Sequence, residues 1–267
     1  MKKSIMATAS ALAVLAAVPA LAQSNGSSVT QSGNDNQATV EQTGSGASSA
    51  VTQSSNDNRA LVRQAGAGAD STINQTGADT VFNPNNVAEV NQTGDSTSLI
   101  NQTGQAASAN VEQNGDGNTS TVDQSGLLAV TGRSDELGPL NYDQTGVRQI
   151  GDDNSSLVVQ QGGSAAQVIQ NSTGAALGNT SEVFQGTGNG GAYVTQIGGN
   201  NDSLVNQQTA ASWPDWVISE SLPSPLCRIV ASEPAEVAVC WISAMLSSPS
   251  WLTVATGVGW PQQAAVC

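Results

Sequence analysis

The chain contains almost none of the side chains that usually form catalytic sites and large apolar cores. It has no histidine, and phenylalanine, tryptophan and tyrosine together make up 3% of its 267 residues. All five tryptophans lie after residue 212, and the first cysteine is Cys227. Without histidine or cysteine, and with scattered carboxylates, the residues before 208 offer no grouping suited to acid–base, nucleophilic or metal-assisted catalysis. We therefore expect neither an enzyme nor a bound cofactor or metal.

Basic residues are also scarce. Seven lysines and arginines stand against 21 aspartates and glutamates, which gives a net charge of −14. This balance argues against binding to nucleic acid and against adhesion to anionic lipid by charge. The acidic residues are spread along the chain, which indicates a role in solubility, and no small-molecule substrate is indicated.

Residues 1–22 are predicted to form a secretory signal peptide. Lys2 and Lys3 provide the basic start, residues 7–18 the apolar stretch, and residues 20–22 (Ala-Leu-Ala) the cleavage signal. The apolar stretch is too short to span a membrane. The mature chain is expected to begin near Gln23 with a short linker, residues 23–28, and to act outside the cytoplasm.

Residues 29–207 are dominated by regularly spaced glutamines. Nine of the fifteen steps between successive anchor glutamines are eleven residues long. Val or Ile stands two places before each anchor, except for Tyr142 before Gln144. A short period kept over this length indicates one small unit that is repeated and stacked. The anchors are Gln31, Gln42, Gln53, Gln64, Gln75, Gln92, Gln102, Gln113, Gln124, Gln144, Gln149, Gln160, Gln170, Gln185, Gln196 and Gln207.

Each unit has the pattern of a short β-strand followed by a turn. Asn36, Ala38, Val40 and Gln42 alternate with other polar residues, so a strand would place these four on one face. Ala or Ser usually stands four places before the anchor, and the residue six places before it alternates between Asn and a smaller residue, which doubles the period to 22 residues. Glycine, asparagine and aspartate close tight turns. The predicted turn glycines are Gly33, Gly44, Gly66, Gly77, Gly94, Gly104, Gly115, Gly151 and Gly198.

The pattern predicts an all-β fold, a flattened β-solenoid of about seven two-stranded rungs with 22-residue repeats. Rungs would stack ~4.7–4.8 Å apart, with like side chains above one another and amide side chains bonded along the stack. The insertions in the steps Gln75–Gln92, Gln124–Gln144 and Gln170–Gln185 are expected at turns. The residues predicted to form amyloid ladders are Gln31, Asn36, Ala38, Val40, Gln42, Val51, Gln53, Asn58, Ala60, Val62, Gln64, Ile73, Gln75, Val111, Gln113, Val122, Gln124, Asn154, Val158, Gln160, Val194, Gln196, Asn201, Val205 and Gln207.

The repeated pattern resembles that of the curlin family, the subunits of bacterial curli fibres. The curlin repeat has the form Gln-x-Gly-x-x-Asn-x-Ala-x-Val-x-Gln, which residues 31–42 match position for position. Residues 149–160 and 196–207 match it with Ser in place of Ala. The resemblance covers about residues 29–207.

This resemblance implies a secreted structural subunit of a Gram-negative bacterium. Such a subunit assembles into extracellular, pilus-like amyloid fibres for cell adhesion and biofilm matrix. The implied partners are further copies of the chain, a second curlin subunit, an outer-membrane export pore and export chaperones.

The predicted solenoid has two open ends that carry the ladder residues of its interior. The first rung, near residues 29–42, and the last, near residues 194–207, could therefore template one another head to tail. A monomeric β-solenoid stalk or adhesin at the cell surface is the alternative, and it would need capped ends. Calcium-binding and ice-binding solenoids fit less well, because the aspartates and the threonine row are irregular. Five charged residues either slow premature assembly as gatekeepers or are simply solvated: Asp35, Asp57, Arg59, Arg63 and Glu112.

Residues 208–267 break the pattern. They hold all five tryptophans, all three cysteines (Cys227, Cys240 and Cys267) and six of the nine prolines. In an exported protein an odd number of cysteines leaves one unpaired or intermolecular. Two interpretations stay open: a small cap or anchoring module, or a segment without a stable fold, including an out-of-frame product.

Overall fold

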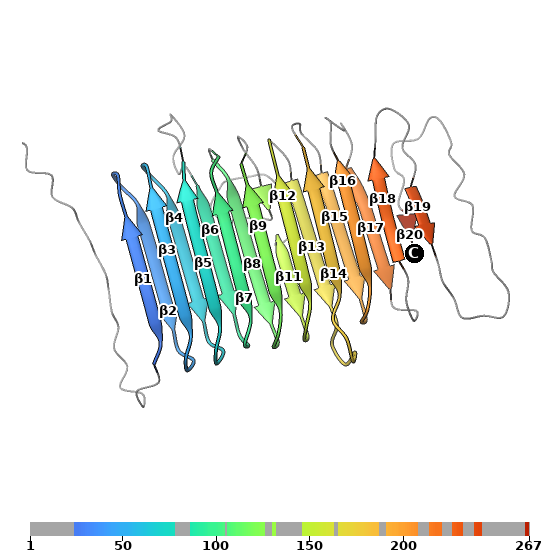
Figure 1. Cartoon of the computed structure of the whole chain (residues 1–267), viewed down its shortest axis with the longest axis horizontal. Coiled ribbons are helices and arrows are strands. Elements are labelled where there is room, and N and C mark those ends of the chain that lie inside the picture. The colour runs from blue at the N-terminus through green and yellow to red at the C-terminus, as the bar shows by residue number, and fades with distance from the viewer. Residues whose placement is uncertain are drawn as a thin grey trace, which may run out of the picture.

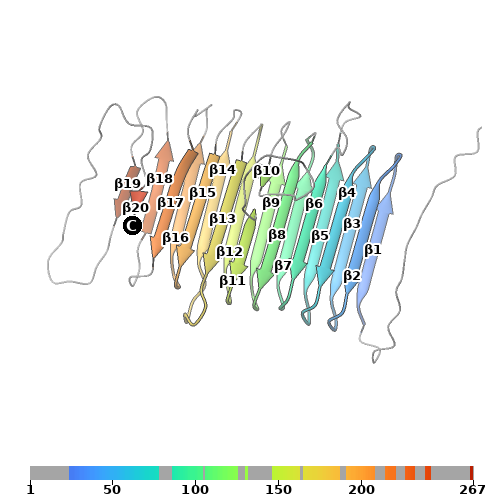
Figure 2. The same cartoon turned by 180° about the vertical axis from the view of Figure 1, so that it is seen from behind.

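In the computed structural model the chain forms two long parallel β-sheets that face one another as a solenoid (Figure 1). The structure describes residues 24–77, 86–104, 106–125, 130–131, 146–162, 165–186, 191–207, 214–220, 226–231, 238–241 and 265–266. The reverse view shows the same order of strands along the molecule, from β1 at one end to β19 at the other (Figure 2). The predicted signal peptide lies outside the described residues.

Successive strands alternate between the two sheets. Sheet A contains, in spatial order, β1 (Gly26–Gln31), β3 (Ser48–Ser54), β5 (Asp70–Thr76), β7 (Thr97–Gln102), β9 (Thr119–Gln124), β12 (Ser155–Gln160), β14 (Thr180–Gln185), β16 (Asp202–Gln207), β18 (Leu226–Ala231) and β19 (Ala238–Trp241). Sheet B contains β2 (Gln37–Gln42), β4 (Arg59–Gln64), β6 (Val87–Gln92), β8 (Ser108–Asn114), β10 (Val130–Thr131), β11 (Val147–Ile150), β13 (Ala165–Asn171), β15 (Gly191–Ile197), β17 (Pro214–Glu220) and β20 (Ala265–Val266).

Neighbouring strands pair in parallel and place each residue opposite its counterpart in the next repeat. Gln31 lies opposite Gln53, and Val40 lies opposite Val62. The predicted fold class is confirmed: the chain is an all-β parallel solenoid of about seven turns, with repeats of about 22 residues and two parallel sheets.

The space between the sheets is filled by aliphatic side chains and small residues. Burial alternates along the strands, as in β7, where Ser98, Ile100 and Gln102 are buried and the residues between them are half-buried. This alternation follows from the two-residue period of a strand. The Val or Ile two places before each described anchor is buried in every rung except the first, where Val40 is partly buried and Val29 is exposed.

The small residue four places before the anchor differs between the sheets. Sheet B has Ala38, Ala60, Ala88, Ala109, Ala166 and Ala192 at this position. Sheet A has Ser49, Ser71, Ser98, Ser120, Ser156, Ser181 and Ser203, which are buried and whose hydroxyls have no hydrogen-bond partner. The sequence predicted a small residue here, but we did not predict that serine and alanine would occupy separate sheets.

The turns between strands bring backbones too close together for most side chains. All nine predicted turn glycines lie within two residues of a strand's end. Gly33 has a φ of 103°, which favours glycine. A Cβ atom on Gly44 would overlap the carbonyl oxygen of Gly66 in the next rung. Glycine therefore allows the turns to stack as closely as the strands do.

One insertion is placed differently from the prediction. The extra residues of the Gln75–Gln92 and Gln170–Gln185 steps connect consecutive strands, as expected. After Gln124, however, β10 and β11 share one strand position between β8 and β13. The 15 residues from 132 to 146 therefore interrupt a strand, whereas the insertion in the Gln124–Gln144 step was expected at a turn. Gln149, and not Gln144, therefore occupies the ladder position beside Gln113. Gln144 itself lies outside the described residues.

The parallel stack also continues beyond the predicted end at residue 207. β17 pairs in parallel with β15, and β18 pairs in parallel with β16. β19 then pairs antiparallel with β18, which ends the parallel arrangement of sheet A. Strands from the tail therefore lie beside the last repeat rung, which is the arrangement expected of a cap, one of the two interpretations left open for residues 208–267.

The buried serine column makes a prediction about stability. Substituting Ser120 by alanine removes a buried hydroxyl that has no partner, so the free energy of unfolding should rise by about 1 kcal/mol. Ser96 is the matched control, because its buried hydroxyl donates to the carbonyl of Gly115 at 2.8 Å. Ser96→Ala should lower the free energy of unfolding by a similar amount. Denaturant unfolding measures both changes, and a destabilised Ser120→Ala variant would contradict this account of the column.

Candidate functional site

The anchor glutamines form two unbroken ladders of hydrogen bonds, one in each sheet. At every step Nε2 donates to Oε1 of the glutamine in the next rung toward the C-terminus, at 2.7–2.9 Å. The sheet A ladder consists of Gln31, Gln53, Gln75, Gln102, Gln124, Gln160, Gln185 and Gln207. The sheet B ladder consists of Gln42, Gln64, Gln92, Gln113, Gln149, Gln170 and Gln196.

The same amide groups also connect the two sheets. Nε2 of Gln113 donates to the carbonyl oxygen of Thr97, and Nε2 of Gln124 donates to that of Ser108, both at 3.0 Å. Each bond ties the end of one strand to the start of a strand in the facing sheet. Both glutamines are fully buried. Burial of an amide is tolerated here because its oxygen and both of its hydrogens can be paired.

Asparagines form shorter ladders at the starts of the strands. In sheet B, Nδ2 of Asn58 donates to Oδ1 of Asn36 at 3.1 Å, and Asn86 continues this ladder. In sheet A the ladder consists of Asn118, Asn154, Asn179 and Asn201, with Nδ2 to Oδ1 distances of 2.8–3.1 Å. The asparagine donors point toward the N-terminal rung, the opposite direction to the glutamine donors.

The structure brings the predicted ladder residues together in columns. The valines and isoleucines occupy the centre of the interior, the glutamines one side of it, and the asparagines the strand starts. We did not predict that the asparagine ladder moves from sheet B to sheet A after Asn86. The sequence does indicate it: six places before the anchor stands Ala107, directly before the sheet B strand, and Asn118, directly before the next strand, which belongs to sheet A. We also did not predict the bonds from glutamine to the facing sheet, which no spacing in the sequence indicates. The role of these columns in assembly stays a prediction.

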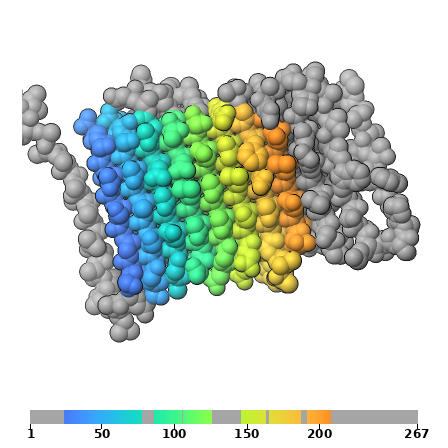
Figure 3. All heavy atoms as spheres, viewed as in Figure 1, coloured from blue at the N-terminus to red at the C-terminus, as the bar shows by residue number. Residues whose placement is uncertain are grey.

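The two edges of the repeat stack differ in exposure. All six residues of β1 are exposed, and Val29 is 45% exposed. At the other edge Val205 is 0% exposed and Gln207 is 3% exposed. Between the edges the described surface consists of closely packed parallel bands (Figure 3). The N-terminal edge is thus the accessible one.

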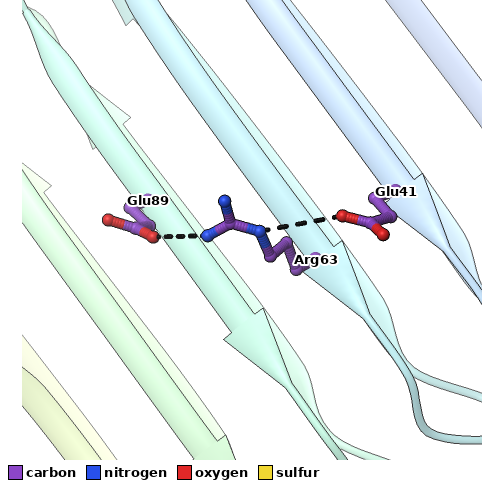
Figure 4. A network of polar contacts seen from close by, with 3 residues as sticks. All are labelled: Glu41, Arg63 and Glu89. Carbon is purple, nitrogen blue, oxygen red and sulfur yellow. Dashed lines mark hydrogen bonds and ion pairs between the residues drawn. The ribbon is translucent and has the colours of Figure 1, made fainter.

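Outward-facing charges also form columns across rungs. Arg63 lies between Glu41 and Glu89, at N–O distances of 3.8 and 3.1 Å (Figure 4). In the same sheet Arg148 lies 3.5 Å from Glu112. Of the five predicted gatekeepers, Arg63 and Glu112 therefore form ion pairs between rungs, while Asp35 and Asp57 lie in turns with positive φ. A role for these residues in delaying assembly stays a prediction.

Two further features of the described residues bear on function. Nowhere in the described parts of the chain do three or more histidine, cysteine, aspartate or glutamate side chains lie close enough to hold a metal ion. The described residues also include no helix long and apolar enough to cross a membrane.

The buried ladder predicts a large effect of one central substitution. Gln113→Ala would remove the ladder donor to the buried oxygen of Gln149 and the ladder acceptor of Nε2 of Gln92. At about 1–3 kcal/mol for each unpaired group, the free energy of unfolding should fall by roughly 2–6 kcal/mol. Asn110→Ala, in the same strand at a half-buried outward position, is the matched control and should change it by less than about 0.5 kcal/mol. Equal effects of the two variants in denaturant unfolding would show that the ladder does not stabilise the fold.

The charge column predicts a smaller effect that depends on salt. Arg63→Glu would place three carboxylates in consecutive rungs, yet these side chains are one-third to two-thirds exposed. The loss of stability should therefore be at most about 1 kcal/mol at low ionic strength and should shrink as salt is added. Thermal unfolding with and without salt measures this difference. A loss that does not change with salt would contradict an electrostatic origin.

Comparison with known proteins agrees with this geometry. Residues 23–54 match the family model of the Curlin associated repeat, so the predicted resemblance is confirmed there. No curated protein and no solved structure matches the chain. Proteins of the curlin repeat family are structural fibre proteins and not enzymes. The chain is a β-solenoid with stacked glutamine and asparagine ladders, and its residues 23–54 match the curlin repeat.

Proposed function

We propose that this protein is a secreted structural subunit that assembles head to tail into extracellular, curli-like amyloid fibres for adhesion and biofilm matrix. The observation that carries the proposal is the continuity of the glutamine ladders, which run through all repeat rungs without a change of partner or direction. A ladder of this kind has no natural end, because each rung presents the same amide groups to the next rung.

The open N-terminal edge supports this proposal. β1 presents one side of its backbone to solvent, together with Val29 and the ladder residue Gln31. Ordinary proteins protect a sheet edge with prolines, inward charges, bulges or covering segments. β1 is uncharged and contains no proline, so it can pair with a strand of suitable register.

The proposal includes a location and a set of partners that follow from the family. Residues 1–22 direct export, and residues 23–25 precede the first strand. The repeat solenoid runs from β1 (Gly26–Gln31), three residues before the predicted start at residue 29, to residue 207. The partners are other copies of this chain, a second curlin subunit, an outer-membrane export pore and its chaperones. The fibre would then lie at the surface of a Gram-negative bacterium, and neither nucleic acid nor a small-molecule substrate takes part.

A monomeric stalk or adhesin is the second candidate, and one observation favours it. β17 and β18 extend over the C-terminal edge, and β19 turns antiparallel to it. A permanent cap of this kind would stop growth at that edge. The two candidates therefore differ in whether the C-terminal edge can be freed.

Fibre formation distinguishes the two candidates. The chain without residues 1–22, diluted from denaturant, should form fibres with a meridional reflection at ~4.7–4.8 Å, and preformed fragments should shorten its lag time. An amyloid-binding dye reports the lag time, and the chain held in denaturant at the same concentration is the control for dye artefacts. A protein that folds into soluble monomers and ignores added fragments would overturn the fibre proposal and support the stalk.

A further inference from the structure

We propose that the C-terminal strands regulate assembly: β17 completes the last rung of the solenoid, and β18 is a displaceable cap that occupies the place of β1 from a second copy. This inference rests on the proposed function. It commits to one occupant of the C-terminal edge, a second copy of this chain.

The number of repeat strands explains the role of β17. The repeat region starts and ends with a strand of sheet A, so it supplies eight strands to sheet A, from β1 to β16, but seven strand positions to sheet B, from β2 to β15. If β1 of a second copy stacked directly on β16, sheet B would lack one strand between the two copies. β17 takes this position, and its Val217 lies opposite Val194, a residue of the core column.

β18 occupies the position that β1 of the next copy would need. Both strands have six residues. β18 pairs with β16 in the parallel register that the repeats use, with Cys227, Ile229 and Ala231 opposite Ser203, Val205 and Gln207. Since only one strand can pair with that side of β16, β18 and an incoming β1 exclude one another.

β1 matches β16 better than β18 does. The corresponding residues of β1 are Ser27, Val29 and Gln31, which repeat the serine, valine and glutamine of β16. Ala231 of β18 replaces the ladder glutamine by a methyl group. A second copy would therefore extend the serine, valine and glutamine columns of sheet A by one more rung.

Asn201 provides an independent sign that β18 is a poor partner. This residue directly precedes β16 and is 1% exposed, yet its Oδ1 is buried without a hydrogen-bond partner. In the preceding rung, Oδ1 of Asn179 accepts bonds from both the backbone N–H and Nδ2 of Asn201. The residue that precedes β18 is Pro225, which has no N–H and no amide.

The residue that precedes β1 would supply the missing donors. It is Asn25, whose own Oδ1 accepts the backbone N–H of Ala47 at 3.0 Å and so already acts as a ladder asparagine. A second copy would place the N–H and Nδ2 of Asn25 beside Oδ1 of Asn201. Exchange of β18 for β1 thus removes a buried unpaired acceptor, which favours displacement of the cap.

The inference is tested by placing the same charge in each of the two tail strands of the otherwise complete chain. Ile229→Asp, opposite Val205 in β18, should weaken the cap and raise the elongation rate on wild-type fibre fragments about tenfold, equivalent to about 1.4 kcal/mol. Val217→Asp, opposite Val194 in β17, should lower that rate about tenfold, because β17 belongs to the growing interface. Val230→Asp, opposite the outward residue Asn206, is the matched control and should change the rate less than twofold.

A second variant introduces no charge, so it tests the cap even if the aspartate variants misfold. Pro225→Asn combined with Ala231→Gln gives β18 the donors of a repeat strand, and it should strengthen the cap and slow elongation about tenfold. Equal rates for all variants, or changes in the same direction for Ile229→Asp and Val217→Asp, would overturn the cap while leaving fibre formation intact. Failure of the wild-type chain to form fibres would instead overturn the proposed function, and the cap with it.

Discussion

The fold depends on the pairing of buried glutamine amides. An interior glutamine such as Gln113 uses one Nε2 hydrogen for the next glutamine along the stack, Gln149, and the other for a backbone carbonyl of the facing sheet, that of Thr97. An unpaired buried amide is costly, so both bonds must be made together. This requirement fixes the register along each sheet and the register between the sheets at the same time. A slip of one residue would also turn every valine of the column to solvent.

The other features of the solenoid support this arrangement. Val and Ile at the centre exclude water from the amides, and alanine facing serine lets the sheets approach closely. Turn glycines such as Gly44 allow connecting backbones to stack at the same spacing as the strands. The exposed ion pairs of Arg63 contribute little energy, but they follow the same register. The few aromatic residues of the repeats are explained as well, since a narrow interior between stacked strands has no room for large rings.

Much of this could be predicted from the sequence because the repeat is short and its chemistry is local. The two-residue period of Asn36, Ala38, Val40 and Gln42 gives the strand, and the 22-residue period gives the rung. The sequence did not indicate that residues 132–146 would interrupt a strand, because Val130 and Thr131 complete the strand of Val147 only through contacts in space. The strands of the tail were missed for a similar reason. Without glutamine anchors, β17 and β18 are recognisable only by their pairing with β15 and β16.

The ends of the solenoid decide what the ladders mean for function. A stack with one open edge and one edge covered by mismatched strands can be a monomer until its cap is exchanged, and a fibre afterwards. This differs from amyloid in which each residue stacks on the same residue of the next chain, because here a chain provides its own neighbours and meets others only at its edges.

Solid-state NMR on fibres grown from a mixture of ¹⁵N-labelled and ¹³C-labelled chains tests this directly. The account predicts that buried residues contact another chain only at the edges, with Gln31 and Val29 of one copy near Gln207 and Val205 of the next. Contacts between chains at the interior ladder, such as Gln113 with Gln113 of a neighbouring copy, would contradict it.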